Sequence, residues 1–372
     1  MSPSGRRPRI LTEAVLPLLF NLAMGVVDLL LLRSLRRECS TTRALLTLVL
    51  ALLAVIAVAS LGEVYARAFT LFGTLFTFLG LLAWGLFLHL PILALSAAAL
   101  LRREARRTSR TLVGASLFTW LFALYAFGIE PTWLEITRYE VVSPKIQERL
   151  RVVVIADLQT DRIGDYERRA IQAALDEKPD LLLLPGDYLH TKSEEEFREL
   201  RVQLVELLRE LDFRAPLGVL AVRGNVDHNE WETLFADIVG AHCFPESGAV
   251  DLGWLHVTAL DLQDSFRSDL AVEPAEAFHI VFGHGPDFAL GDVQAELLIA
   301  GHTHGGQVRL PFYGPPITLS RVPRDWAAGR TELEGGRTLI VSRGVGMERG
   351  YAPRLRFGCR PEVVVVDLVP GK

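Results

Sequence analysis

The sequence predicts an all-α membrane region followed by a layered α/β domain, and three observations lead to this fold class. Residues 10–129 are dominated by Leu, Ala, Phe and Val, whereas the chain from Glu135 onward is rich in charged residues, Gly and Pro. Uncharged runs in the first part are long enough to cross a bilayer. Short β-branched runs in the second part alternate with amphipathic helical patterns. We therefore expect a membrane region over residues 1–133 and a soluble domain over residues 134–372.

Four apolar segments meet or approach the roughly 20 residues that a spanning helix needs. They are residues 15–32, 44–61, 69–101 and 112–129. The third segment should kink near Pro91. The first is the weakest because it contains Asp28, which we expect near a helix end, since a central carboxylate costs roughly 2.5–3.5 kcal/mol. Segments that are apolar on every side are poor candidates for core helices of a soluble domain. We expect an integral membrane protein whose partner is the lipid bilayer.

Arginines in the loops predict the orientation in the membrane. They follow the first and the third apolar segments, at Arg33, Arg36, Arg37, Arg43, Arg102, Arg103, Arg106, Arg107 and Arg110. The positive-inside rule places these loops in the cytoplasm and the soluble domain outside it. Arg6, Arg7 and Arg9, before the first segment, argue for the opposite orientation.

Charge and cysteine usage exclude some classes of function. The formal net charge of −5 argues against a nucleic-acid partner, which needs a basic face. Cys39, Cys243 and Cys359 show no CxxC spacing that would indicate a thiolate metal site. Cys243 and Cys359 could pair in an oxidising compartment, but their positions in the sequence do not place them in contact.

Polar side chains follow five apolar runs of the soluble half, each where a strand should end. The runs are residues 150–156, 180–185, 218–223, 278–282 and 297–300, and continuous runs of this kind are typical of strands buried on both faces. Open α/β sheets bind their ligands at such strand ends. The potential ligands that follow the runs are Asp157, Gln159, Asp187, Asn225, His284, His302 and His304.

These residue types point to a metal site. Their oxygen and imidazole donors suit divalent ions such as Mn, Fe, Zn or Mg. Glycine or proline lies in each strand-end loop and lets the backbone turn sharply. One Asp after a strand is an ordinary loop residue. Five strand ends that all carry potential ligands are hard to explain as loop residues that merely face solvent.

In this order, the motifs resemble the calcineurin-like metallophosphoesterase superfamily over residues 136–368. The matching strings are D-x-Q from Asp157, the Gly-Asp and Gly-Asn pairs, and GHTH from Gly301. GHTHGGQ and the later SRGVG are similar to the membrane-associated branch of that family. The resemblance implies a four-layer α/β/β/α sandwich and a hydrolase of phosphoric ester or diphosphate bonds.

The resemblance also implies two divalent metal ions that share one carboxylate. Asp157, Gln159, Asp187 and His304 would hold the first ion, and Asp187, Asn225, His284 and His302 the second. Two ions about 3.5–4 Å apart can polarise a phosphoryl group and activate a water for in-line attack. We expect four residues to take part in catalysis: Asp187, Asn225, His302 and His228. His228 is the candidate proton donor.

Two positions depart from the family pattern. Gln159 stands where the family usually has His, and a carboxamide favours weaker binding or a harder ion such as Mn or Mg. Val226 stands where many members have a His that protonates the leaving group. His228 is a nearby substitute, and His190 is close enough in the sequence to line the site. Without a donor, substrates with acidic leaving groups, such as diphosphates, would react best.

Three classes of function remain open: an enzyme, a non-catalytic scaffold and a transporter. The leading hypothesis is a membrane-bound phosphoesterase acting on a phosphomonoester, a phosphodiester or a diphosphate, including lipid-linked ones. An alternative is a UDP-diacylglucosamine pyrophosphatase of lipid A synthesis, which needs a cytoplasmic active site and so the opposite orientation. A degenerate, non-catalytic metal-binding scaffold would explain Gln159 and Val226. A transporter is less consistent because the apolar segments show no repeat or charge cluster.

Overall fold

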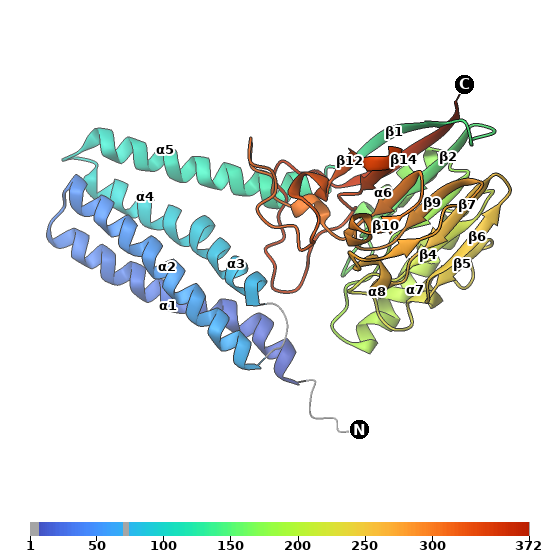
Figure 1. Cartoon of the computed structure of the whole chain (residues 1–372). Helices are drawn as coiled ribbons and strands as arrows, with labels where there is room; N and C mark the ends of the chain where they lie inside the picture. Colours follow the sequence, from blue (N-terminus) through green and yellow to red (C-terminus); the bar gives the residue numbers. More distant parts are fainter. Residues whose placement is uncertain (1–6, 70–73, 372) are drawn as a thin grey trace. The chain divides into compact units, whose positions relative to one another are not determined.

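The structure, a computed structural model, describes residues 7–69 and 74–371. The chain divides into two compact units. Residues up to 128, with residues 349–354, form a helical unit, and the rest form an α/β unit (Figure 1). Arg6 and residues 70–73 of the third predicted segment lie outside the described residues.

Within the described residues, four helices are long and apolar enough to cross a membrane: Val15–Arg37, Thr41–Tyr65, Leu75–Leu101 and Arg106–Thr132. Each contains or overlaps one of the four predicted segments. Side chains such as Leu18, Leu53 and Phe118 are exposed, as expected of surfaces that face lipid. The α-helices of this unit are α1 (Arg7–Arg37), α2 (Thr41–Phe69), α3 (Thr74–Trp84), α4 (Leu90–Leu101) and α5 (Arg106–Ala123).

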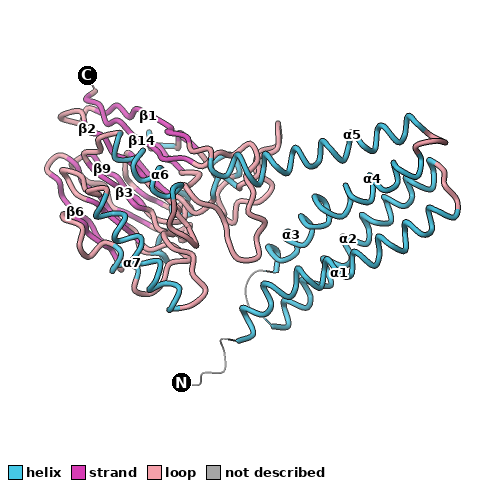
Figure 2. The backbone as a smooth tube through the Cα atoms, turned by 180° about the vertical axis from the view of Figure 1, so that it is seen from behind, coloured by secondary structure: helices cyan, strands magenta, loops and turns pink. Residues whose placement is uncertain are grey.

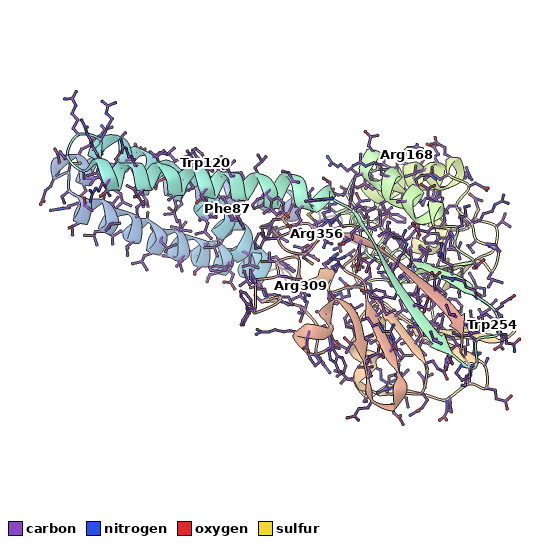
Figure 3. All side chains as sticks on the ribbon, turned by 90° about the horizontal axis from the view of Figure 1, so that it is seen from above. Phe87, Trp120, Arg168, Trp254, Arg309 and Arg356 are labelled. Carbon is purple, nitrogen blue, oxygen red and sulfur yellow. The ribbon has the colours of Figure 1, made fainter. Side chains whose placement is uncertain are left out.

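A π-helical turn, η2 (Gly85–His89), interrupts the third span just before Pro91. Pro91 has no N–H, so it cannot donate to the carbonyl of Phe87 four residues earlier. The indole nitrogen of Trp120 in α5 donates to that carbonyl instead, at 3.1 Å (Figure 3). The irregularity predicted near Pro91 is therefore a π turn that a neighbouring helix stabilises.

A polar cluster joins α1 to this turn. His89 Nδ1 lies 2.7 Å from Asp28 Oδ2, and His89 Nε2 lies 3.0 Å from Asn21 Oδ1. The amide nitrogen of Asn21 donates to the carbonyl of Pro17, which orients its oxygen toward the imidazole. Asp28 lies well inside α1, so the expectation that it sits near a helix end is wrong. Pairing with His89 makes an acidic residue tolerable in this segment.

We expect His89→Leu to destabilise the protein more than the double variant Asp28→Leu/His89→Leu. The single change leaves a carboxylate without its partner, whereas the double change replaces both groups with apolar ones. Interhelical polar contacts in membranes are worth about 0.6–1.7 kcal/mol, so the loss should lie in that range. Unfolding by sodium dodecyl sulfate from detergent micelles measures the free energy. Strictly additive effects of the two substitutions would contradict the pairing.

The α/β unit contains two six-stranded sheets among its described residues. The first has the order β1-β14-β2-β3-β4-β5, from β1 (Glu135–Ser143), β14 (Glu362–Pro370), β2 (Leu150–Val154), β3 (Leu181–Leu184), β4 (Val219–Val222) and β5 (Ala241–Phe244). The second has the order β12-β13-β11-β9-β7-β6, from β12 (Gly329–Glu332), β13 (Thr338–Val341), β11 (Leu297–Ala300), β9 (Phe278–Phe282), β7 (Leu255–Ala259) and β6 (Gly248–Leu252). Strands β8 (Ala271–Val272) and β10 (Asp292–Val293) form a separate short pair.

The two sheets pack face to face over one apolar cluster, which includes Val152 and Leu183 from the first sheet and Ile280 from the second. Helices α6 (Asp165–Asp176) and α7 (Glu194–Glu210) cover the outer face of the first sheet (Figure 2). This arrangement confirms the predicted α/β class.

The outer face of the second sheet is covered differently from the other faces. Short elements pack there, including the four-residue helix α8 (Leu262–Ser265) and the 3₁₀ turn Asp287–Leu290. The fourth layer therefore consists of short turns rather than long helices. The three cysteines are free, so Cys243 and Cys359 do not pair.

The strand directions bring the predicted ligand loops together. β2, β3 and β4 are parallel neighbours in the first sheet, and β9 and β11 are parallel neighbours in the second. Parallel neighbours end at the same edge of their sheet, which is where open α/β sheets bind ligands. The loops that follow these five strands are the ones that carry the candidate ligands.

Candidate metal centre

Five of the candidate ligands adopt a left-handed backbone directly after their strands. The φ angles are 49° for Asp157, 30° for Gln159, 56° for Asp187, 68° for His302 and 48° for His304. This conformation costs about 1–2 kcal/mol for a residue with a Cβ. Strain of this kind clusters at functional sites, where it fixes the direction of a side chain.

Glycines let neighbouring loops close around the two aspartates. A Cβ atom on Gly224 would lie 2.1 Å from Asp187 Oδ1, and one on Gly301 would lie 2.6 Å from Asp157 Oδ2. A Cβ atom on Gly344, in the SRGVG string, would lie 2.7 Å from the Cβ atom of Asp157. Any larger residue at these positions would displace a carboxylate.

Asp157, Asp187 and His284 form the centre of the site. Their ligand atoms all lie within 4.8 Å of one another, and the three residues are buried. His284 Nε2 is 3.4 Å from Asp187 Oδ2, and His284 Nδ1 is 3.9 Å from Asp157 Oδ1. The aspartates follow β2 and β3 of the first sheet, and the histidine follows β9 of the second. The edges of the two sheets therefore meet at this point.

The hydrogen bonds of His284 show that a cation fits beside it. Burial lowers the pKa of His284 to about 4, so the ring is neutral near pH 7 and carries one N–H. Nδ1 lies 2.9 Å from the Pro185 carbonyl and uses that hydrogen. Nε2 is then a lone pair that faces Asn225 Oδ1 at 2.8 Å and Asp187 Oδ2 at 3.4 Å. Three acceptors that face one another are the arrangement a metal ion requires.

The buried carboxylates also fit a nearby cation. Desolvation raises the pKa of Asp187 to about 7. Desolvation, with the charge of Asp187, raises the pKa of Asp227 to about 7 and that of Asp157 well above its usual value. A divalent ion would favour the ionised forms and reverse these shifts.

Asp227 holds two of the ligand loops together. Its Oδ2 accepts the N–H groups of Asp187 and Gly224, each at 2.8 Å, and its Oδ1 accepts the N–H of Tyr188 at 2.7 Å. The loops after β3 and β4 are thereby joined through one side chain. Asp227 is a positioning residue rather than a candidate ligand.

The amide of Gln159 is oriented by two side chains. Its nitrogen donates to Glu348 Oε2 at 3.1 Å and lies 3.4 Å from His190 Nδ1. The amide oxygen, the atom that could bind a metal, is on the other branch of the group. His190, which the sequence placed near the site, thus contacts a candidate ligand. Glu348 was missed, and its only signal in the sequence is its position two residues after SRGVG.

His302 and His304 come from the loop after β11. The His302 N–H donates to both carboxylate oxygens of Asp157, at 2.9 and 3.1 Å. Its ring lies edge-on to His284 with the centroids 5.0 Å apart, and burial and that ring lower the pKa of His302 to about 3. His304 is buried in the same loop. The loop is shaped by Thr303, whose hydroxyl donates to the carbonyl of Ala327.

His228 lies against α7. Its ring stacks on Phe197 with a centroid distance of 4.2 Å, and its Nδ1 accepts the N–H of Glu230. Among the described residues, these contacts do not join His228 to Asp187 or to the other candidate ligands. Its role as a proton donor stays a prediction.

Comparison with known proteins identifies relatives of the α/β unit. Residues 150–306 match the family model of calcineurin-like phosphoesterases. The chain is 29% identical to the uncharacterized metallophosphoesterase YkuE of Bacillus subtilis over 264 residues, which cover 66% of this chain and 88% of YkuE. It is 28% identical to the phosphodiesterase YaeI of Escherichia coli over 284 residues, which cover 72% and 98%. It is 25% identical to the UDP-2,3-diacylglucosamine pyrophosphatase LpxG of Chlamydia trachomatis over 324 residues, which cover 69% and 94%.

We expect the melting temperature of the metal-free protein to fall as pH rises from 5 to 8. The pKa values of Asp187 and Asp227, about 7 when folded, exceed the roughly 3.9 of an unfolded Asp. The protonated Asp187 and Asp227 therefore stabilise the folded state fully below about pH 4, and this stabilisation is lost as pH rises through 7. Saturating Mn²⁺ should remove this slope. A chelated sample whose melting temperature does not change over this range would contradict the buried charge cluster.

Gln159→His should change metal preference more than substrate preference. An imidazole in place of a carboxamide favours Zn or Fe over Mn or Mg. Titration calorimetry of the chelated protein with Mn²⁺ and Zn²⁺ measures the change, and Gln172→His, on the exposed side of α6, is the matched control. Identical titrations for the wild type and Gln159→His would count against Gln159 as a ligand.

Proposed function

We propose that this chain hydrolyses lipid-linked phosphoesters or diphosphates at a membrane. The premise is that it contains a calcineurin-like phosphoesterase domain and is a hydrolase of that family. The family uses divalent metal ions, and the α/β unit offers a buried group of residues that could hold them. The membrane anchor, the substrate and the individual residue roles belong to this proposal.

One observation supports the proposed metal-dependent hydrolysis. Asp157, Asp187 and His284 come from three loops far apart in the chain and from both sheets, yet their ligand atoms lie within 4.8 Å of one another. Asn225 joins them through its 2.8 Å contact with His284. This convergence supports metal binding, and measured turnover would separate an enzyme from a non-catalytic metal-binding scaffold.

In this proposal, each of two metal ions has four protein ligands. The first ion would be held by Asp157, Gln159, Asp187 and His304, and the second by Asp187, Asn225, His284 and His302. Bound ions would polarise the phosphoryl oxygens and make a water nucleophilic near neutral pH. His284 and His302, neutral because burial lowers their pKa values, present lone pairs rather than protons.

The position after Asn225 sets the preferred leaving group. Val226 has no proton to give, and its N–H already donates to Asp187 Oδ1 at 2.9 Å. Unless His228 acts as the donor, the leaving group would depart as an anion. Diphosphates and phosphodiesters with acidic leaving groups meet this requirement better than simple alkyl phosphates.

The helical unit supplies the anchor in this proposal. With all four candidate spans crossing the membrane, the positive-inside rule would put the arginine-rich loops in the cytoplasm and the catalytic unit outside it. A site outside the cytoplasm favours phospholipids and cell-envelope phosphoesters as substrates.

A second candidate follows from the similarity to LpxG. A UDP-2,3-diacylglucosamine pyrophosphatase acts on a nucleotide-linked lipid, and such substrates are made in the cytoplasm. This function therefore requires the catalytic unit to face the cytoplasm. The two candidates share their chemistry and differ in topology.

The topology can be measured with a membrane-impermeant maleimide on intact cells. In a background without native cysteines, we expect Val239→Cys, which is 79% exposed in the α/β unit, to be labelled. Arg103→Cys, in the arginine-rich loop after α4, is the matched control and should be labelled only after lysis. The reverse pattern would favour the pyrophosphatase.

We expect Asp187→Ala to reduce kcat/KM by roughly 10³-fold or more, because both ions would lose a shared ligand. Purified protein should be assayed with phosphomonoester, phosphodiester and diphosphate substrates in Mn²⁺, Mg²⁺, Zn²⁺ and Fe²⁺. The matched control Asp237→Ala removes an exposed carboxylate that pairs with Arg209 on the surface, and it should retain activity. A wild-type rate for Asp187→Ala with every metal would refute the mechanism.

A further inference from the structure

The helical unit contains a cavity of about 510 Å³. Its walls come from α1, α3, η2 and the helical turn Leu124–Ile129, through apolar residues that include Leu16, Leu81, Phe87 and Phe127. The volume is within the range of about 300–1,000 Å³ that is typical of small-molecule sites. Because the walls belong to helices that are apolar enough to cross a membrane, the cavity is suited to an apolar ligand.

One wall of the cavity is not helical. It is formed by residues 350–354, part of the segment 349–354 that we call the strap. The strap lies between β13 and β14 in the sequence but belongs to the same compact unit as the helices. A Cβ atom on Gly80 of α3 would lie 2.4 Å from the carbonyl oxygen of Tyr351. The absence of a side chain at Gly80 therefore lets the strap lie directly against α3.

The residues that flank the strap in the chain belong to the α/β unit and contact candidate ligand loops there. Before it, Glu348 accepts the amide N–H of Gln159 at 3.1 Å. After it, the fully buried Arg356 donates to the carbonyls of Arg343 at 2.7 Å and His304 at 3.4 Å (labelled in Figure 3). The chain on either side of the strap is thus held to loops that carry candidate metal ligands.

We propose that the cavity binds one acyl chain of the substrate and that the strap forms one wall of this site. This inference rests on the proposed phosphoesterase function and names its substrate as a lipid with an anionic phosphoester head. Aliphatic and aromatic walls bind a hydrocarbon chain through burial of apolar surface. Arg354 of the strap also lines the cavity, and a guanidinium pairs well with phosphate.

A matched pair of substrates tests the proposal on the full-length protein in detergent micelles. p-Nitrophenyl hexadecyl phosphate and p-nitrophenyl ethyl phosphate release the same acidic leaving group and differ only in chain length. We expect the wild type to show a KM at least roughly tenfold lower for the hexadecyl ester, because chain binding adds to affinity without changing the reacting bond.

Substitutions that fill the cavity should remove this difference. Ala83 lines the cavity, so Ala83→Leu should raise KM for the hexadecyl ester modestly and Ala83→Trp by roughly tenfold or more, with the ethyl ester unaffected. Unchanged turnover of the ethyl ester also shows that the variants fold. Ala57→Trp, at an exposed position of α2 outside the cavity, is the matched control and should alter neither KM.

The outcomes separate the two proposals. Equal KM values for both esters in the wild type, or an equal effect of Ala83→Trp on both, would overturn the acyl-chain site, and the cavity would then hold at most a structural lipid. Hydrolysis of neither ester, with any of the four metals, would overturn this inference, and it would refute the proposed function as well if the phosphomonoester and diphosphate substrates were also inert.

Discussion

Asp157 and Asp187 lie buried beside a neutral His284 at the meeting edge of two sheets, and this concentration of negative charge is the constraint on which the site depends. Without a cation, desolvation and mutual repulsion raise the pKa values of these carboxylates. Two carboxylates brought together in so little solvent are costly for folding unless positive charge compensates them. The arrangement makes physical sense as a site that is completed by bound metal.

The rest of the α/β unit serves to hold these groups in place. Parallel strands in each sheet direct the ligand loops to one edge. Glycines such as Gly224 and Gly301 allow the loops to approach closely, and Asp227 ties two of them together. The left-handed backbone at Asp187 and its counterparts points the side chains inward at an energetic cost. The apolar core between the sheets is what makes that cost tolerable.

Local patterns were enough to predict much of this molecule. Apolar runs of sufficient length predicted the four long helices, and apolar runs that end in polar residues predicted the strands and the loops that carry the candidate ligands. These features depend on neighbours in the sequence. The contacts that were missed join segments far apart in the chain. Glu348 contacts Gln159, and Asp28 pairs with His89 well inside a helix. The strap against Gly80 likewise has no local signal, because a glycine in an apolar helix does not reveal what it touches.

The most direct test of the central claim is to locate the metal. A crystal structure of the Mn²⁺-loaded protein, with diffraction recorded at the manganese absorption edge, would show each bound ion as an anomalous peak. Our account predicts a peak between Asp187 Oδ2, Asn225 Oδ1 and His284 Nε2, and a second one beside Asp157. Ordered Asp157, Asp187 and His284 side chains with no peak among them, while manganese binds elsewhere on the protein, would contradict it.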